Sequence, residues 1–242
     1  MSNESTVQVG WFVDAEFGDF VFPDPIPVKA KRGAPLSGRA VQACPAVNEL
    51  ERRLFEVRCP FHMDLELEQT KSGFDLFVVD KTTRIDTDIA AKFIKLMEPS
   101  IWRSKNVPVV QIFSPYIFFS DEEVFLQQLP PFLDQQFQKW PGLLIPGRFQ
   151  ITNWMRPLNW AFEWTDTSTP IRLKQGQPLY YVQFETSRPS QALKLVRAKI
   201  TDEVKQFRKG ASGAPKFVSN TFKLMDTAAK RRPEKLLVPE KI

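Results

Sequence analysis

Apolar and polar residues alternate along several short segments, which predicts β-strands separated by turns. The clearest case is the pair of segments 63–68 and 74–79, which a TKSG loop joins in the pattern of a β-hairpin. In the second half, proline and glycine separate short aromatic runs, which predict strands at residues 149–153, 159–164, 171–173 and 178–185. Extended segments are also predicted at residues 7–13, 17–22, 107–119 and 193–199.

Apolar residues at helical spacing predict helices between these strands. Positions 47, 50, 54 and 57 form such a stripe in a helix that begins at Pro45 and ends before Pro60. Residues 86–97 have a similar stripe. Ser120 and Glu123 have the spacing of a capping box, which predicts a helix over residues 120–129. Two further helices are predicted at residues 201–209 and 219–230.

Together these elements predict an α+β fold, with an antiparallel β-sandwich or barrel-like sheet and three to five peripheral helices. Residues 1–210 are expected to form a single domain, whose β-rich C-terminal half spans residues 139–199. Residues 211–242 are expected to form a basic helical tail behind a flexible GASGAP linker. The chain has 242 residues, 43% of them apolar and 21 of them phenylalanine, so it can bury a substantial core.

The net charge of +5 is concentrated near the C-terminus. From residue 199 onward there are 11 Lys/Arg and 5 Asp/Glu, which leaves 22 and 23 in the first 198 residues. Such a tail can make a weak contact with a polyanion, because clustered cations displace counterions from it. The alternative, which the sequence favours, is a solubilising appendage. Its deletion is then expected to leave the fold nearly as stable, unless the apolar stripe at positions 222, 225 and 229 docks on the body.

Several classes of enzyme lack the residues that they need. His62 is the only histidine, which argues against serine and cysteine hydrolases and against two-histidine iron sites. No phosphate-binding glycine loop is present. Cys44 and Cys59 are isolated and each precedes a proline, so neither a zinc site nor a disulfide is expected. We expect no cofactor and no metal. Without a long apolar run, no membrane insertion is expected, and the predicted location is the cytoplasm.

The segment 139–185 holds most of the candidate chemistry. Its four tryptophans lie between proline and glycine turns, and they either line a cleft or form the core of a small β-domain, which is the more common arrangement. Glu163 and Glu185 lie within aromatic strands, where desolvation could raise the pKa of either carboxylate. Nearby arginines could pair with them or bind an anion. The candidate ligand-binding residues are Trp154, Arg156, Trp160, Glu163, Arg172, Tyr180 and Glu185.

The same segment carries a family resemblance. Its WPG turn, PGRF, NWMRPLNWAFEW and PIRLKQGQPLYYVQFE resemble uncharacterised bacterial and phage proteins, in which a Trp-rich strand pair precedes a G-[EQ]-P turn and a final aromatic strand. The similarity covers about a fifth of the chain. It implies a phage-encoded or phage-like accessory protein, but it implies no activity and transfers no catalytic residue.

Two classes of function follow from the sequence. The first and favoured one is a non-catalytic binding or assembly protein, which uses the aromatic β-rich half as its interface and the basic tail for a secondary contact. The second is a small-molecule-binding protein or enzyme with an aromatic, arginine and glutamate pocket in residues 148–185. A concave pocket that unites these side chains would favour the second class, whereas a flat or packed face would favour the first.

Overall fold

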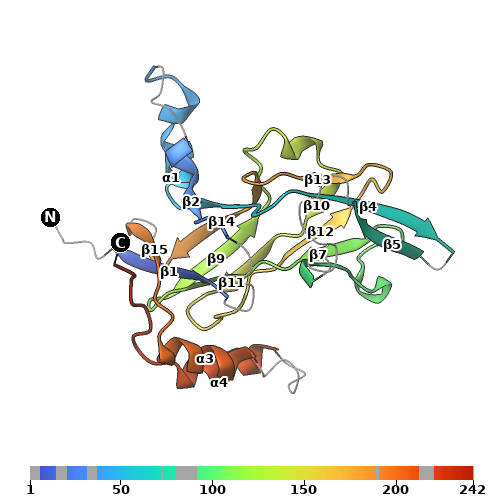
Figure 1. Ribbon diagram of the computed structural model, residues 1–242. Coiled ribbons are helices and arrows are strands. Elements are labelled where there is room, and N and C mark those ends of the chain that lie inside the picture. Colours follow the sequence, from blue (N-terminus) through green and yellow to red (C-terminus); the bar gives the residue numbers. More distant parts are fainter. Residues whose placement is uncertain are drawn as a thin grey trace.

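A computed structural model describes residues 6–14, 21–31, 37–71, 73–79, 92–188, 191–212 and 221–241 of the chain (Figure 1). The strands are β1 (Val7–Val13), β2 (Ile26–Pro27), β3 (Leu54–Arg58), β4 (Met63–Thr70), β5 (Gly73–Val78), β6 (Ile94–Leu96), β7 (Val109–Ile112), β8 (Tyr116–Phe119), β9 (Val124–Leu129), β10 (Gly142–Leu144), β11 (Gly147–Gln150), β12 (Trp160–Trp164), β13 (Ile171–Leu173), β14 (Pro178–Thr186) and β15 (Leu193–Arg197). The α-helices are α1 (Pro45–Glu51), α3 (Asp202–Ser212) and α4 (Thr221–Arg231), and the 3₁₀ helices are η2 (Val28–Lys31), η3 (Val41–Ala43), η4 (Pro99–Ile101) and η5 (Phe137–Lys139).

The described strands form four sheets, in an α+β arrangement that is mostly antiparallel. Their strand orders are β15-β1-β8, β10-β12-β7-β6, β11-β9-β14-β3-β2 and β13-β4-β5. Among these strands, only β1 and β15 pair in parallel. The described strands do not close into a barrel, and a sandwich packing of the sheets stays a prediction. No helix within the described ranges is long and apolar enough to cross a membrane.

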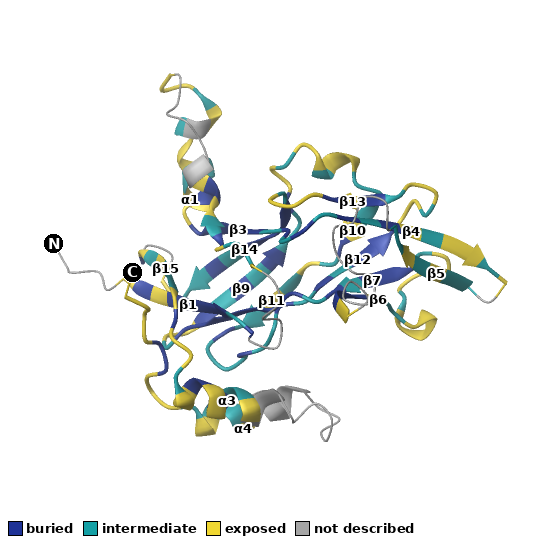
Figure 2. Cartoon of the chain, viewed as in Figure 1, coloured by how far each residue is buried: buried dark blue, intermediate teal, exposed yellow. Residues whose placement is uncertain are grey.

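The sheets share one large aromatic core. Strand β12 shows how it is built, because Trp160, Phe162 and Trp164 alternate along the strand and are all fully buried. Trp140 packs on this row, with ring centroids 4.9 Å from Trp160 and 4.7 Å from Phe162. Burying a side chain such as Phe162 contributes roughly 1.5–3 kcal/mol. Burial concentrates in the sheets, whereas the described parts of α1, α3 and α4 are largely intermediate or exposed (Figure 2).

Several predicted elements are confirmed. The hairpin is present as β4 and β5, and the four strands predicted in the second half are present as β11 to β14, although β11 ends at Gln150 and a turn follows. The two C-terminal helices are present as α3 and α4. Thr201 lies at the start of α3, where its Oγ1 accepts a hydrogen bond from the backbone N–H of Val204 at 3.3 Å.

Three predicted helices require correction. The helix that begins at Pro45 ends at Glu51, and residues 54–58 form β3, because this buried segment pairs with β14. Residues 124–129 are β9, whose side chains alternate between buried and half-buried positions. Residues 94–96 are β6. Residues 92–93 of that predicted helix are helical, whereas residues 86–91, like most of the predicted strand at residues 17–22 and the linker beyond Ser212, lie outside the described residues.

Ser120 explains why the capping-box pattern was misleading. Its Oγ accepts a hydrogen bond from the backbone N–H of Glu122 at 3.2 Å and donates one to the carbonyl of Gln8 at 2.8 Å. The side chain therefore closes a turn between β8 and β9 and links that turn to β1. A serine in a turn and a serine that caps a helix make the same local contact, so sequence alone does not separate them.

The segment that follows α4 returns to the body of the protein. Leu236 and Leu237 are buried in a cluster with side chains of β1, β8 and α3. The backbone N–H of Lys199 donates to the carbonyl of Val238 at 2.8 Å, and Pro239 forms an isolated antiparallel bridge with Ala198. The described C-terminal residues thus extend the edge of the sheet that contains β15.

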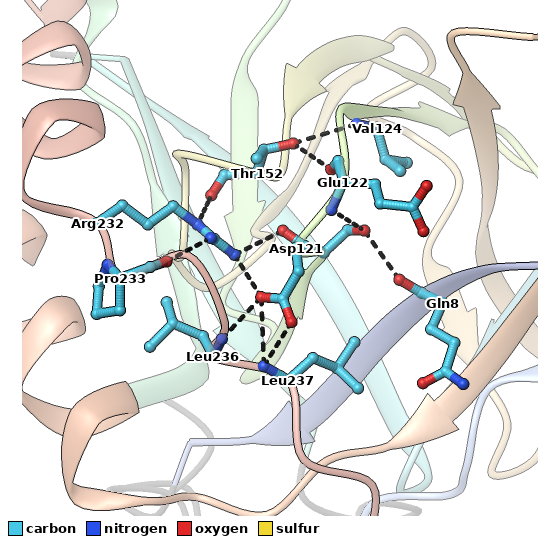
Figure 3. Close-up of polar contacts among 10 residues, drawn as sticks. Gln8, Asp121, Glu122, Val124, Thr152, Arg232, Pro233, Leu236 and Leu237 are labelled. Atoms are coloured by element: carbon cyan, nitrogen blue, oxygen red, sulfur yellow. Dashed lines mark hydrogen bonds and ion pairs between the residues drawn. The ribbon is translucent and has the colours of Figure 1, made fainter.

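A carboxylate clamp holds this segment in place (Figure 3). Asp121 accepts hydrogen bonds from the backbone N–H groups of Leu236 and Leu237, at 2.8 and 3.0 Å, and from Arg232 at 2.8 Å. The buried guanidinium of Arg232 also donates to the carbonyls of Ser120 and Thr152, each at 2.7 Å. The domain boundary at residue 210 stays a prediction. Because of these contacts, however, we expect deletion of the tail to destabilise the body, contrary to the expectation from sequence.

Replacement of the clamp carboxylate should be strongly destabilising. Asp121→Ala leaves Arg232 buried without its carboxylate and removes the acceptor of two backbone N–H groups, so we expect a loss of about 3–5 kcal/mol. The matched control is Glu122→Ala at the exposed neighbouring position, with an expected change within about 0.5 kcal/mol. Chemical denaturation measures both, and equal losses in the two variants would contradict this role.

Candidate functional site

An open groove of about 490 Å³ lies between the segment that precedes β10 and the strand β13 with its following turn. This volume is within the range of pockets that hold small ligands. The groove is lined by Asp134, Gln136, Phe137, Lys139, Trp140, Pro141, Thr169, Pro170, Arg172, Lys174, Gln177 and Pro178. We refer to it as the basic groove, for the charges described below.

The first wall of the basic groove is anchored on the aromatic core. Asp134 Oδ1 accepts a hydrogen bond from the backbone N–H of Gln136 at 2.8 Å, which fixes the turn that leads into η5. Phe137 then stacks on Trp140, with ring centroids 5.2 Å apart and planes inclined by 25°. Because Trp140 packs in turn on Trp160, this wall is connected to the buried row of β12.

The second wall follows from strand alternation in β13. Ile171 and Leu173 are fully buried, so Arg172 between them points away from the core. A turn then joins β13 to β14, in which Gln177 Oε1 accepts a hydrogen bond from the backbone N–H of Lys174 at 3.0 Å. Gly176 occupies this turn with φ of +82°, a conformation that glycine adopts without strain. The turn places the exposed Lys174 beside Arg172 on the groove.

The charges of the basic groove are unbalanced. Lys139, Arg172 and Lys174 are exposed and make no ion pair with any described residue. Asp134 is the one carboxylate among the lining residues, and its Oδ1 is engaged by backbone N–H groups. The lining therefore combines three cations with one anion over an aromatic wall, an arrangement that suits an anionic ligand.

The seven predicted ligand-binding residues do not meet in one site. Of these, Arg172 lines the basic groove. Trp160 is buried and lines a separate apolar cavity of about 20 Å³, which has room for about one water molecule. Tyr180 is also buried, and its hydroxyl is 2.6 Å from Oγ of Ser114. Trp160 and Tyr180 thus belong to the core, which is the alternative that the sequence favoured for the aromatic residues.

The remaining candidates lie on other surfaces. Trp154 packs on Phe149, with ring centroids 6.0 Å apart, and the guanidinium of Arg156 lies 5.3 Å from the Trp154 ring. Glu185 lies on the five-stranded sheet, where its Oε2 accepts hydrogen bonds from Arg148 Nε at 3.0 Å and Nη2 at 2.9 Å. Neither group contributes to the basic groove or to the small apolar cavity.

Glu163 is engaged by a residue that the sequence did not indicate. Its side chain is buried, and Oε1 accepts a hydrogen bond from Arg103 Nε at 2.6 Å while Oε2 accepts one from Nη2 of the same guanidinium. The hydrogen bond from Arg103 holds the pKa of Glu163 below its ordinary value of 4.5, although burial acts in the opposite direction. The expectation of a pKa raised by desolvation is therefore wrong for Glu163.

Other reactive side chains are buried in unreactive forms. Burial raises the pKa of the Cys59 thiol to about 12, and its Sγ donates to the carbonyl of Phe61 at 3.0 Å. Burial also raises the pKa of the Tyr116 and Tyr180 hydroxyls. These groups stay protonated at neutral pH and pack in the core. The part of the chain that the structure describes contains no group of three or more His, Cys, Asp or Glu side chains that could hold a metal ion.

Comparisons with known proteins add no family to this description. No protein-family model matches the chain, and no curated protein sequence matches it. The resemblance to bacterial and phage proteins stays a prediction.

The Glu163–Arg103 pair should give stability that depends on pH. Because the pKa of Glu163 is lowered in the folded state, the pair stabilises the fold above pH 4.5, and this contribution is lost as the pH falls through the lowered pKa. Glu163→Gln should therefore be less stable than the wild type at neutral pH, and the difference should shrink in acid. Arg103→Gln should behave in the same way. Urea denaturation from neutral pH into acid measures the free energy of unfolding of each protein. A difference between wild type and variant that does not change with pH would contradict the stabilising role of the pair.

The two cysteines should differ in reactivity. Cys44 is exposed and Cys59 is buried with a raised pKa, so iodoacetamide at about pH 8 should alkylate only Cys44 in the folded protein. Mass spectrometry of the intact protein should show one adduct before denaturation and two after it. Rapid labelling of Cys59 in the folded protein, with Cys44→Ser as the matched background, would show that the core around it opens readily.

Proposed function

We propose that this protein is a non-catalytic binding protein that takes an anionic ligand or partner in the basic groove. The observation that carries this proposal is a set of three exposed cations beside an aromatic wall, namely Lys139, Arg172 and Lys174. None of the three forms an ion pair with a described carboxylate. Such cations repel one another when the groove is empty, and an anion relieves that repulsion. Electrostatics therefore favour binding of an anion in the groove.

Binding is better supported than catalysis. The two carboxylates among the candidate residues from sequence, Glu163 and Glu185, are each engaged by an arginine, and neither lines the basic groove. General-base catalysis most often uses an imidazole or a carboxylate within reach of the bound substrate. In the groove this leaves Asp134, whose Oδ1 already accepts backbone hydrogen bonds. The enzyme alternative consequently has the weaker support.

The proposed binding should depend on salt. All three cations are exposed, so their attraction for an anion is screened as ionic strength rises. Orientation of the ligand would come from Arg172, since a guanidinium can donate two parallel hydrogen bonds to a carboxylate or phosphate. The lysines would act as point charges on either side. This division of roles predicts that Arg172 and Lys174 are not equivalent.

Anilinonaphthalene sulfonate is a suitable first probe, because it combines an anionic group with a flat apolar ring system. We expect its fluorescence titration to give a weaker affinity by about tenfold for the double variant Arg172→Gln, Lys174→Gln, a loss of about 1.4 kcal/mol. The matched control is Lys194→Gln, an exposed lysine on β15 outside the groove, which should bind the probe like the wild type.

Three further results would sharpen this test. Inorganic phosphate should compete with the probe, and added salt should weaken binding in the wild type more than in the double variant. Melting temperatures should be unchanged, because both substituted side chains are exposed. An affinity that is equal in the wild type and the double variant would overturn the proposed function.

A further inference from the structure

The basic groove is bordered by a strand at the end of its sheet. Strand β13 pairs with β4, and no described strand pairs with it on the other side. The backbone of a terminal strand has N–H and C=O groups that can pair with another extended segment. This recognition mode is common for peptides, in which main-chain hydrogen bonds give affinity and alternate side chains give specificity.

The cations of the groove have the spacing of an extended chain. Arg172 and Lys174 are separated by one residue at the end of β13, so their Cα atoms are about 6.6 Å apart where the strand geometry continues. Carboxylates at alternate positions of an extended peptide repeat at the same distance and project to the same side. A single small anion can lie between these two cations, whereas such a peptide places one carboxylate at each of them.

The opposite wall supplies a third charge and an apolar surface. Lys139 lies on this wall together with Phe137 and Trp140, so a segment in the groove would have β13 on one side and η5 on the other. Pro170 and Pro178 lie at the two ends of the β13 wall, and neither has an N–H group that would be left unpaired. The length of β13, three residues or about 10 Å, suits a short segment and not a long one.

From these features we infer that the occupant of the basic groove is a short extended segment of a partner protein, with carboxylates at alternate positions, that lies along β13. This inference rests on the proposed function and names its class of ligand. Arg172 and Lys174 recognise the two carboxylates, Lys139 contributes from the opposite wall, and the backbone of β13 pairs with the segment. Specificity then comes from the spacing of the carboxylates rather than from total charge.

Two peptides of identical composition test the spacing. In one, two glutamates are separated by a single residue, and in the other they are adjacent, so that they project to opposite sides of an extended chain. Isothermal titration of the full chain should show at least about tenfold tighter binding of the first peptide. Methylation of its backbone nitrogens at alternate positions should weaken binding if β13 pairs with it, and amide exchange at Arg172, whose N–H faces the open edge of β13, should slow in the complex.

A charge reversal distinguishes loss of binding from loss of the fold, because the variant is expected to gain a new ligand. Arg172→Glu with Lys174→Glu should reject the acidic peptide and bind one in which lysines replace the separated glutamates. Lys194→Glu, the control outside the groove, should keep the wild-type preference. Equal binding of the two acidic peptides, with anilinonaphthalene sulfonate and phosphate still bound in the groove, would overturn the peptide inference alone. The proposed function would be overturned as well if the two acidic peptides bound equally and if the groove variants bound anilinonaphthalene sulfonate and phosphate as tightly as the wild type.

Discussion

Burial of apolar side chains from all four sheets, many of them aromatic, in one core is the constraint on which the rest of this structure depends. A strand can bury only one of its faces in that core, so the row Trp160, Phe162 and Trp164 fixes the orientation of β12. The same requirement in β13 buries Ile171 and Leu173 and thereby exposes Arg172. The position of the basic groove is in this sense a consequence of core packing, since the outward residues of β13 are those that the core does not use.

Some arginines of this protein form ion pairs that stabilise the fold, whereas others form none with any described residue and can bind a ligand. Arg103 is engaged by Glu163, and Arg232 by Asp121. Arg208 of α3 pairs with the buried carboxylate of Asp14. Arg208 and Arg232 thus hold α3 and the segment after α4 on the body, which reduces the charge available for a polyanion. The exposed cations of the groove differ because they form no ion pair with a described carboxylate, although Asp64 lies opposite Arg172 in the ladder of β4 and β13. This contrast supports the binding role that we propose for the groove.

The sequence anticipated the β-rich second half because local pattern and tertiary environment agree there: the apolar and aromatic segments that form β12, β13 and β14 are short and bounded by turns. It was wrong for β3 and β9, where a proline start and a capping box favoured helix locally but pairing with β14 prevailed. Arg172 was predicted from its residue type. The role of Arg103 was not, because it pairs with a residue 60 positions away, and nothing in its loop indicates that contact.

The most direct test of this account is a map of the backbone amides that respond to an anionic ligand. In a titration of isotope-labelled protein with anilinonaphthalene sulfonate, followed by amide NMR, we expect the largest shift changes in residues 134–141 and 169–178, on the two walls of the groove. The region around Trp154 and Arg156 should change little, although the sequence placed it among the candidates. Changes confined to that region, or to the outer face around Glu185, would contradict the assignment of the binding site to the basic groove.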